Sequence, residues 1–522
     1  MTISKEKWPN GVIMKISFII SALAFLIMIA IRLKLTFSIS TDLAGVEQNV
    51  IYSIQTFLDT GKLYTDPGHL PFSITQYTPI YHYVCAFTAK AFHVDPLSDI
   101  QQLYLIGRTW NIVFNVLSAV SVYLIARRFG LHWPLAAILG FLAFISVFRQ
   151  GFSVRPDSLY DCFSLWSVYL LIVFLDERKP ARSKLEYLFI SLVLSVCAIF
   201  TKQSGIQLPV IFLTFFLFVR EWKAFASASA IYLMVFSAFL LFFVMLYKDA
   251  FLKNVIGGLD NGISIHWFQS RVWGNGFKIK VILPAAAALY IVVAKLLVFK
   301  GDTIERFLCF CISGMFVFSA ITILKDGSNI QYFYVPVCLT FVLIAHYTNS
   351  HIKHWRLYRL ALPGLSFLLM MLLAVNVRHH FQWLRDIEYV KKARIGEKER
   401  AARAVAEYFY KDLGIGANDY IFADLAIESA DLKINGRRGI NNLLFRNCVV
   451  PQLEMFDAIK KAKVLGFENF DKCLKEGQIK YIISSNPPNS FQLTENLILL
   501  RDRNYLLLKR IGGYSIYKYR GS

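Results

Sequence analysis

Two carboxylates stand where a long apolar segment ends, in the stretch STDLAGVEQN at residues 40–49. A carboxylate partly buried at the rim of a membrane is more basic than one in water, so Asp42 or Glu47 could accept a proton from a hydroxyl group. The stretch VEQNVIYSIQTFL has apolar residues at helical spacing and precedes Gly61, which predicts a helix with Glu47 in its first turn. Asp42 as a helix cap and Glu47 as a complement to the helix dipole are the structural alternatives.

Three cations have spacings that suit the binding of an anion. Arg108 lies in the first turns of an apolar segment, where a guanidinium must find an anionic partner or extend to the interface. Arg155 and Asp157 flank a proline just before another apolar segment, and Lys202 stands between two such segments. Arginine and lysine stabilise the negative charge of phosphate groups. The alternatives are a local ion pair between Arg155 and Asp157 and a solvated lysine in a turn.

Aromatic and amide side chains accompany these charges. Tyr77, Tyr81 and His82 occur in QYTPIYHYV, and Asn329 and Tyr332 occur in KDGSNIQYFYVP. They could shape a substrate site, or they could form an interfacial aromatic belt and a capped helix start. We identify no metal site, because no ligand spacing demands one, although carboxylates and histidine are compatible with a divalent ion.

The composition is that of a polytopic membrane protein. Of the 522 residues, 56% are hydrophobic and 17% are charged, and the mean hydropathy is +0.48, far above the range of soluble proteins. The net charge of +21 is spread along the chain. The absence of a dense basic tract argues against nucleic-acid binding and favours contact with anionic lipid or an anionic lipid substrate.

Apolar segments predict about eleven transmembrane helices, several of which must extend into polar flanks to reach the ~20 residues of a span. The first segment is expected to be a retained helix and not a signal peptide. The predicted spans are Val12–Leu35, Leu103–Arg127, Trp133–Phe148, Ser158–Leu175, Leu185–Phe200, Ile206–Val219, Phe225–Tyr247, Ile279–Phe299, Phe307–Leu324, Tyr332–Ala345 and Leu360–Val377.

The charges of the connecting loops predict the orientation. Loops such as DERKPARSK and HIKHWRLYR are dense in lysine and arginine, which marks the cytoplasmic side. The N-terminus is then cytoplasmic, and all of the polar motifs described above fall on the opposite face of the membrane. With eleven spans the C-terminus also lies on that face.

Two regions outside the spans are expected to fold. Residues 37–102 form a first outside loop, long enough to be structured and functional. Residues 379–522 lack long apolar segments, which predicts a small extracytoplasmic α/β domain. In this domain we expect a helix at EKERAARAVAEYFYKDLG, strands at DYIFAD and IKYIISS, and a hairpin at YLLLKRIGGYSIYKY. Cys448 and Cys473 in this domain could form a disulfide.

The chain resembles the GT-C glycosyltransferases that use polyprenyl-phosphate sugars, which include protein O-mannosyltransferases and lipid A aminoarabinose transferases. The matching stretches are GVEQNVIYSIQTFLDTGKLYTDP, QYTPIYHY, GRTWNIVFNVLSAVSVYLIARRFG, RPDSLYDCFSLW, IFTKQSGIQLP and DGSNIQYFYVP, roughly within residues 10–380. One departure concerns the acids: many relatives have two adjacent acids at the start of the first-loop helix, whereas here Val46 precedes Glu47 and Asp42 lies further upstream.

The resemblance implies a protein of the bacterial inner membrane that transfers a sugar from polyprenyl phosphate to a glycan, lipid or protein acceptor, with inversion at the anomeric carbon. Glu47 is then expected to be the base, with Asp42 as the alternative. Arg108, Arg155 and Lys202 would surround the phosphate. The remaining substrate-binding residues would be Asp157, Tyr77, Tyr81, His82, Asn329 and Tyr332.

Two other functions are weighed against this one. A transporter or flippase of lipid-linked saccharides would have charged residues along a pathway, but we find no inverted repeat and no acid at mid-span. A glycan polymerase or ligase would also use a polyprenyl donor. Such enzymes usually carry their large outside loop between late spans, whereas the large loop of this chain is the first.

Overall fold

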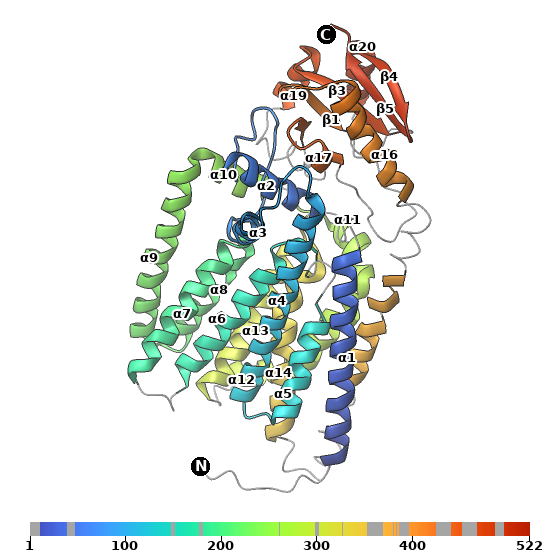
Figure 1. Cartoon of the computed structure of the whole chain (residues 1–522). Helices are drawn as coiled ribbons and strands as arrows, with labels where there is room; N and C mark the ends of the chain where they lie inside the picture. Colours follow the sequence, from blue (N-terminus) through green and yellow to red (C-terminus); the bar gives the residue numbers. More distant parts are fainter. Residues whose placement is uncertain are drawn as a thin grey trace.

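The structure is a computed structural model that describes most of the chain. The described residues are 11–38, 47–147, 151, 153–176, 181–259, 262–297, 302–325, 327–351, 369–378, 380–382, 384–385, 396–423, 440–450, 467–485 and 495–521. A bundle of long helices forms one end of the molecule, and a small domain with a β-sheet forms the other (Figure 1). The helix α1 (Gly11–Ser38) runs from the far end of the bundle toward this domain.

The bundle contains helices at the first ten of the predicted spans. Six of its helices are long and apolar enough to cross a membrane, and three shorter apolar helices accompany them. The bundle helices are α1 (Gly11–Ser38), α4 (Ile100–Arg128), α5 (Trp133–Ile145), α6 (Asp157–Leu175), α7 (Ala181–Ile199), α8 (Gln207–Phe218), α9 (Trp222–Tyr247), α12 (Leu283–Leu297), α13 (Thr303–Thr322) and α14 (Tyr334–His351). Of the eleventh predicted span, residues 369–377 are described, and they are helical.

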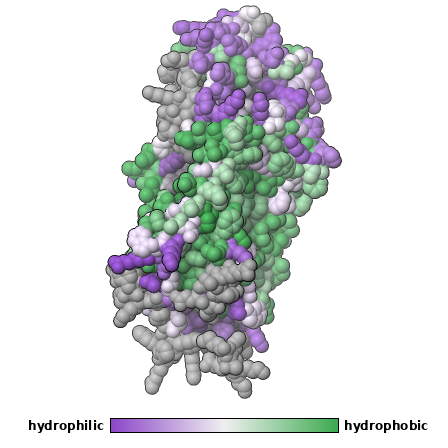
Figure 2. Space-filling model, turned by 90° about the vertical axis from the view of Figure 1, so that its left-hand side faces the viewer, coloured by the Kyte–Doolittle hydropathy of each residue, from purple (hydrophilic) through white to green (hydrophobic). Residues whose placement is uncertain are grey.

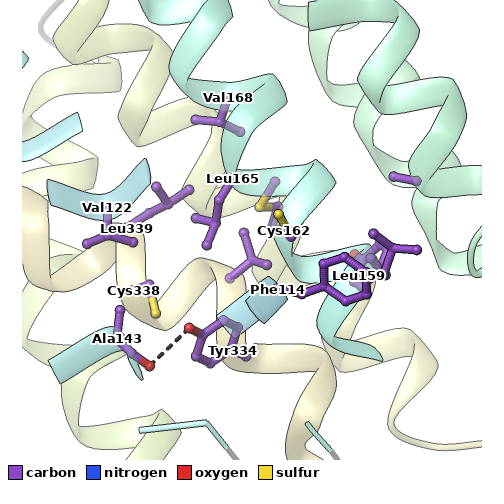
Figure 3. Close-up of a cluster of buried hydrophobic side chains, with 14 of the residues drawn as sticks. Phe114, Val122, Ala143, Leu159, Cys162, Leu165, Val168, Tyr334, Cys338 and Leu339 are labelled. Atoms are coloured by element: carbon purple, nitrogen blue, oxygen red, sulfur yellow. Dashed lines mark hydrogen bonds between the residues drawn. The ribbon is translucent and has the colours of Figure 1, made fainter. Parts of the chain in front are cut away.

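Burial distinguishes central helices from peripheral ones. Only 11% of the most apolar window of α9 is buried, compared with 72% for the segment Ile330–Ser350 that includes α14. Aliphatic, aromatic and cysteine side chains pack together where α4, α6 and α14 meet, and the Tyr334 hydroxyl donates a hydrogen bond of 3.0 Å to the carbonyl of Ala143 (Figure 3). On the face that Figure 2 shows, the surface of the bundle is largely hydrophobic beneath the hydrophilic small domain. This distribution is expected where helices face lipid tails.

Helices of the first loop lie across the end of the bundle, below the sheet domain (Figure 1). The predicted helix after Asp42 is confirmed as α2 (Glu47–Thr60), and Gly61 follows it with a φ of +71°. α3 (Ile80–Ala91) comes later in the same loop. The short helix α10 (Asp249–Val255), the single turn α11 (Ile265–Trp267) and a π-helix at Phe268–Ile282 connect α9 to α12.

The small domain is a five-stranded sheet with the strand order β2-β1-β3-β5-β4. β1 pairs in parallel with β2 and β3, whereas β5 is antiparallel to β3 and β4. The predicted strands and hairpin are confirmed, and Gly512 and Gly513 have the positive φ values of a tight turn. The elements are α16 (Gly396–Glu407), β1 (Tyr420–Ala423), α17 (Ile440–Leu443), β2 (Cys448–Val449), α19 (Phe467–Lys475), β3 (Ile479–Ser485), α20 (Glu495–Asn504), β4 (Tyr505–Ile511) and β5 (Tyr514–Tyr519).

The suggested disulfide does not occur in the structure. Cys448 lies in β2 and Cys473 lies in α19, and both thiols are buried and free. Both side chains belong to the hydrophobic core of the small domain. Their burial explains why two cysteines are tolerated in a polar region without being paired.

Candidate functional site

Asp157 is the centre of a buried ion network at the start of α6. Its Oδ1 lies 2.7 Å from the Nζ of Lys202, and its Oδ2 lies 3.0 Å from the Nε of Arg155. The Nη2 of Arg155 donates a hydrogen bond of 3.1 Å to the Tyr77 hydroxyl. The Nζ of Lys202 lies 4.1 Å from the centroid of the Tyr332 ring, a cation–π distance. The network therefore joins five of the predicted substrate-binding residues, which come from four separate stretches of sequence.

Local backbone geometry positions Lys202 in this network. Lys202 lies between α7 and a 3₁₀ turn at Gln203–Ile206, and its carbonyl accepts a hydrogen bond of 2.8 Å from the Gly205 amide. A Cβ atom on Gly205 would lie 2.5 Å from the backbone of Ala198 and Ile199. Glycine therefore lets the turn fold back against the end of α7, which directs Lys202 toward the start of α6.

Two cations share one carboxylate in this network. Burial lowers the pKa of Lys202, but the adjacent Asp157 carboxylate more than offsets that effect, so the pKa lies above its usual value and the ammonium stays charged. Burial raises the pKa of Tyr77, so its hydroxyl stays protonated. The group of Arg155, Lys202 and Asp157 thus has a net charge of +1, which suits an added anion such as a phosphodiester.

Glu47 and Arg108 form a second buried ion pair. Glu47 Oε1 accepts from Arg108 Nε at 2.9 Å, and Oε2 accepts from Arg108 Nη2 at 2.7 Å. Both side chains are fully buried. The Arg108 guanidinium also lies 5.1 Å from the centroid of the Tyr104 ring. The ion pair therefore joins Glu47, in the first turn of α2, to Arg108, in the N-terminal part of α4.

This pairing changes the interpretation of both residues. Arg108 is expected from sequence to contact phosphate because no acid lies close to it along the chain. The structure instead supplies an acid from 61 residues away. The carboxylate is also fully buried, and both of its oxygens accept hydrogen bonds from Arg108. The pair therefore fixes the first turn of α2 to α4, and the roles of Glu47 as base and of Arg108 at the phosphate stay predictions.

The segment 153–156 connects the two ion networks. The backbone amide of Val154 donates a hydrogen bond of 2.6 Å to Glu47 Oε1. The amide of Asn111, one turn after Arg108 on α4, donates to the carbonyls of Ser153 and Arg155. The residues that precede Asp157 are thus held from two sides, by α2 and by α4.

The other predicted site residues have structural contacts. Tyr81 is fully buried, and its hydroxyl donates a hydrogen bond of 3.2 Å to the Gly107 carbonyl. His82 is also buried, and burial lowers its pKa to about 4, so the imidazole is neutral near pH 7. Asn329 caps a 3₁₀ turn by accepting from the Ile330 amide at 2.7 Å. Asp42 lies outside the described residues.

One buried acid is not singled out by the sequence patterns. Asp161 lies one helical turn beyond Asp157 on α6, and its Oδ2 accepts a hydrogen bond of 2.5 Å from Gln331 Nε2. Its side chain is 1% exposed. Helical spacing from Asp157 is the signal that could have identified it. Asp161 lies in the first turns of the candidate span Asp157–Leu175, close to its end and not at its middle.

No cluster of metal ligands occurs among the described residues. In that part of the chain, no three or more His, Cys, Asp or Glu side chains gather closely enough to hold a metal ion. The arrangement as described is therefore two linked ion networks at one end of a helical bundle, rich in arginine, lysine and tyrosine.

Comparisons with known proteins agree with this architecture. Residues 79–247 match the family described as dolichyl-phosphate-mannose-protein mannosyltransferase. A comparison with curated protein sequences gave no match.

Solved structures resemble the chain over nearly its whole length. Apo ArnT from Cupriavidus metallidurans is 12% identical with a TM-score of 0.59, and the match covers 95% of this chain and 97% of ArnT. ArnT bound to undecaprenyl phosphate has a TM-score of 0.55 at 12% identity, with 96% and 97% covered. The archaeal oligosaccharyltransferase AglB from Archaeoglobus fulgidus, in complex with an inhibitory peptide and a dolichol-phosphate, has a TM-score of 0.53 at 15% identity, with 97% and 74% covered. The chain thus shares its fold with the GT-C type glycosyltransferases.

Proposed function

We propose that the protein transfers a sugar from a polyprenyl-phosphate donor to a glycan, lipid or protein acceptor at the outer face of the membrane. The observation that carries this proposal is the convergence of Arg155, Lys202 and Tyr77 on Asp157 at one end of the helical bundle. The neighbour ArnT has been crystallised with undecaprenyl phosphate, and AglB with a dolichol-phosphate. A lipid phosphate beside membrane helices is therefore the ligand that best suits these cations.

The proposed chemistry begins at the anomeric carbon of the donor sugar. The bond between this carbon and the phosphate oxygen breaks, and the phosphate leaves with the electron pair as the negative charge on it grows. Arg155 and Lys202 stabilise that charge, and Asp157 holds the two cations at a fixed spacing. The acceptor hydroxyl attacks from the opposite face of the sugar and gives its proton to a carboxylate, so the configuration at the anomeric carbon is inverted.

We propose Asp42 as this carboxylate in preference to Glu47. Three hydrogen-bond donors occupy Glu47, two from Arg108 and one from the Val154 amide, and its side chain is fully buried. A fully buried carboxylate engaged in this way is not open to an approaching acceptor hydroxyl. Many relatives have two adjacent acids at the start of this helix, and in this chain Asp42 is the next acid upstream of Glu47. Glu47 then fixes α2 to the bundle.

The location follows from the same proposal. The site would face the outside of a bacterial inner membrane, with the N-terminus in the cytoplasm and the small domain outside. The lysine and arginine content of the loops supports this orientation. A polyprenyl tail would then lie in the lipid beside the bundle, while the acceptor would approach from the side of the small domain.

Donor binding by purified protein tests the proposed role of Lys202. Loss of one charge-assisted contact costs about 1.5–3 kcal/mol, so Lys202→Gln should weaken binding of a short-chain polyprenyl phosphate about tenfold or more. Lys253→Gln is the matched control, because Lys253 pairs with Asp66 at 3.0 Å in a partly exposed ion pair away from Asp157. Equal affinity in the two variants and the wild type would contradict the proposed phosphate site.

A further inference from the structure

One face of α2 is bound by the small domain. Gln48, Tyr52, Gln55 and Asp59 are spaced so that they lie along one side of the helix. All four contact the segment 442–446, which begins in α17. Figure 1 shows α17 directly above α2. The polar face of α2, which a surface helix would turn to water, is therefore covered by protein.

Asn442 makes the central contact of this interface. Its Nδ2 donates to Gln55 Oε1 at 2.7 Å and to the Gln48 carbonyl at 3.2 Å. The Gln55 amide donates back to the Asn442 carbonyl at 3.2 Å. Asn442 is 2% exposed and Gln55 is fully buried. Buried amide pairs of this kind fix a relative position more sharply than apolar contact does, because each unmade hydrogen bond is costly.

Further contacts surround this amide pair. Arg446 Nη2 lies 2.6 Å from Asp59 Oδ1, and the Tyr52 hydroxyl donates to the Phe445 carbonyl at 3.3 Å. The aromatic rings of Tyr52 and Phe445 have centroids 5.1 Å apart. Tyr52 belongs to the same hydrophobic core as the sheet of the small domain. The domain and α2 therefore form one packed unit.

The other face of α2 is attached to the bundle. Val50, Ile51, Ile54 and Phe57 belong to the bundle's own hydrophobic core. Glu47 adds the bonds to Arg108 and to the Val154 amide. The helix is thus held between the small domain and the membrane helices, and the acid-bearing start of the helix lies in this contact region.

We infer that the small domain is a positioning part of the reaction site, with Asn442 as the residue that orients α2 and, with it, the first turn that carries Glu47. This inference rests on the proposed function. Lys202 and Arg155 are held in place without the Asn442 contacts, because both pair with Asp157. Loss of the Asn442 contacts should therefore disturb the acid side of the site and leave phosphate binding nearly intact.

Asn442→Ala and Asn447→Ala form a matched pair of variants. Asn447 is equally buried in the same domain, but its amide donates to the carbonyls of Gly416 and Asp419 within that domain. The full-length variants would be compared by kcat, by the KM for the polyprenyl-phosphate sugar, by melting temperature and by hydrogen exchange of the peptide covering residues 47–60.

The expected result is specific to Asn442. Its kcat should fall about tenfold or more, since small misplacement of a reacting group has effects of this size. Its KM should change less than threefold or so, and exchange should rise in α2. The loss in the double variant Asn442→Ala/Gln55→Ala should be smaller than the sum of the two single losses, because the residues share a contact, although Gln55 also donates to the Pro96 carbonyl at 2.6 Å.

Several outcomes would overturn the inference. These are an unchanged kcat in folded Asn442→Ala protein, equal losses in both asparagine variants, or unchanged exchange in α2. If the wild type transfers no sugar from any polyprenyl-phosphate donor, the proposed function fails instead. The exchange of α2 in the two variants then still decides whether the small domain fixes this helix.

Discussion

At the scale of single residues, the fully buried pair of Glu47 and Arg108 has a measurable signature in stability. Removing one partner leaves the other charge buried without compensation, which typically costs about 3–5 kcal/mol. Glu47→Gln and Arg108→Gln should each lower the melting temperature of the purified protein. The double variant should be more stable than the sum of the two losses predicts, and additive losses would show that the pair does not act as one unit.

A second prediction at residue scale distinguishes Asp42 from Glu47 as the catalytic base. Asp42→Asn removes a proton acceptor but preserves the capping ability of the side chain. Transfer should fall at least ~10²-fold, the low end of general base catalysis, while polyprenyl-phosphate binding and melting temperature remain unchanged. Glu47→Gln should lose stability together with activity. If Asp42→Asn is fully active and the loss in Glu47→Gln is confined to kcat in a stable protein, then Glu47 is the base.

At the scale of secondary-structure elements, the turn between α7 and α8 is a closely packed support of the site. A methyl group on Gly205 would collide with the backbone of Ala198 and Ile199 at 2.5 Å. Gly205→Ala should therefore displace Lys202, cost about 1–3 kcal/mol of stability and weaken binding of polyprenyl phosphate. Gly68→Ala is the control, because its Cβ would have only one contact, at 3.4 Å with Asp66. Donor affinity and melting temperature of both variants give the comparison, and equal behaviour would contradict the packing argument.

The sequence predicts elements well where the signal is local. The apolar stripe and Gly61 define α2, and the glycine pair at 512–513 defines the hairpin of β4 and β5. Contacts between distant segments are not encoded in this way. Arg108 meets an acid 61 residues away, and Gln55 meets Asn442 across 387 residues. The polar face of α2 therefore suggests a solvent-exposed surface, although a folded domain covers it.

The residues of the candidate site are likewise predicted only in part from the sequence. Charge and aromatic character identify Tyr77, Arg155, Asp157, Lys202 and Tyr332, and the structure brings them together. The same criteria select Asn329, which caps a 3₁₀ turn, and Tyr81, whose buried hydroxyl donates a hydrogen bond to the Gly107 carbonyl. Residue type alone does not distinguish a side chain that faces a site from one that packs behind the residues of the site.

At the scale of the whole molecule, the proposed orientation places the first loop and the small domain on one side of the membrane. Single cysteines at the exposed positions Lys62 and Lys475 should react in intact cells with a maleimide that cannot cross the membrane. A cysteine at exposed Lys223, in the predicted cytoplasmic loop, should react only after permeabilisation. The native cysteines are buried or half-buried, so background labelling should be low. Labelling of Lys223→Cys alone in intact cells would reverse the orientation.

The central claim is that the network around Asp157 supports sugar transfer from a polyprenyl-phosphate donor. The most direct test is mass spectrometry of lipid-linked sugars in a strain that lacks the protein, complemented with the wild type, Lys253→Gln or the double variant Arg155→Gln/Lys202→Gln. A polyprenyl-phosphate monosaccharide should accumulate in the deletion strain and disappear with the wild type and Lys253→Gln, but persist with the double variant. An unchanged pool of lipid-linked sugars, or accumulation of a lipid-linked oligosaccharide on the cytoplasmic side, would contradict the account.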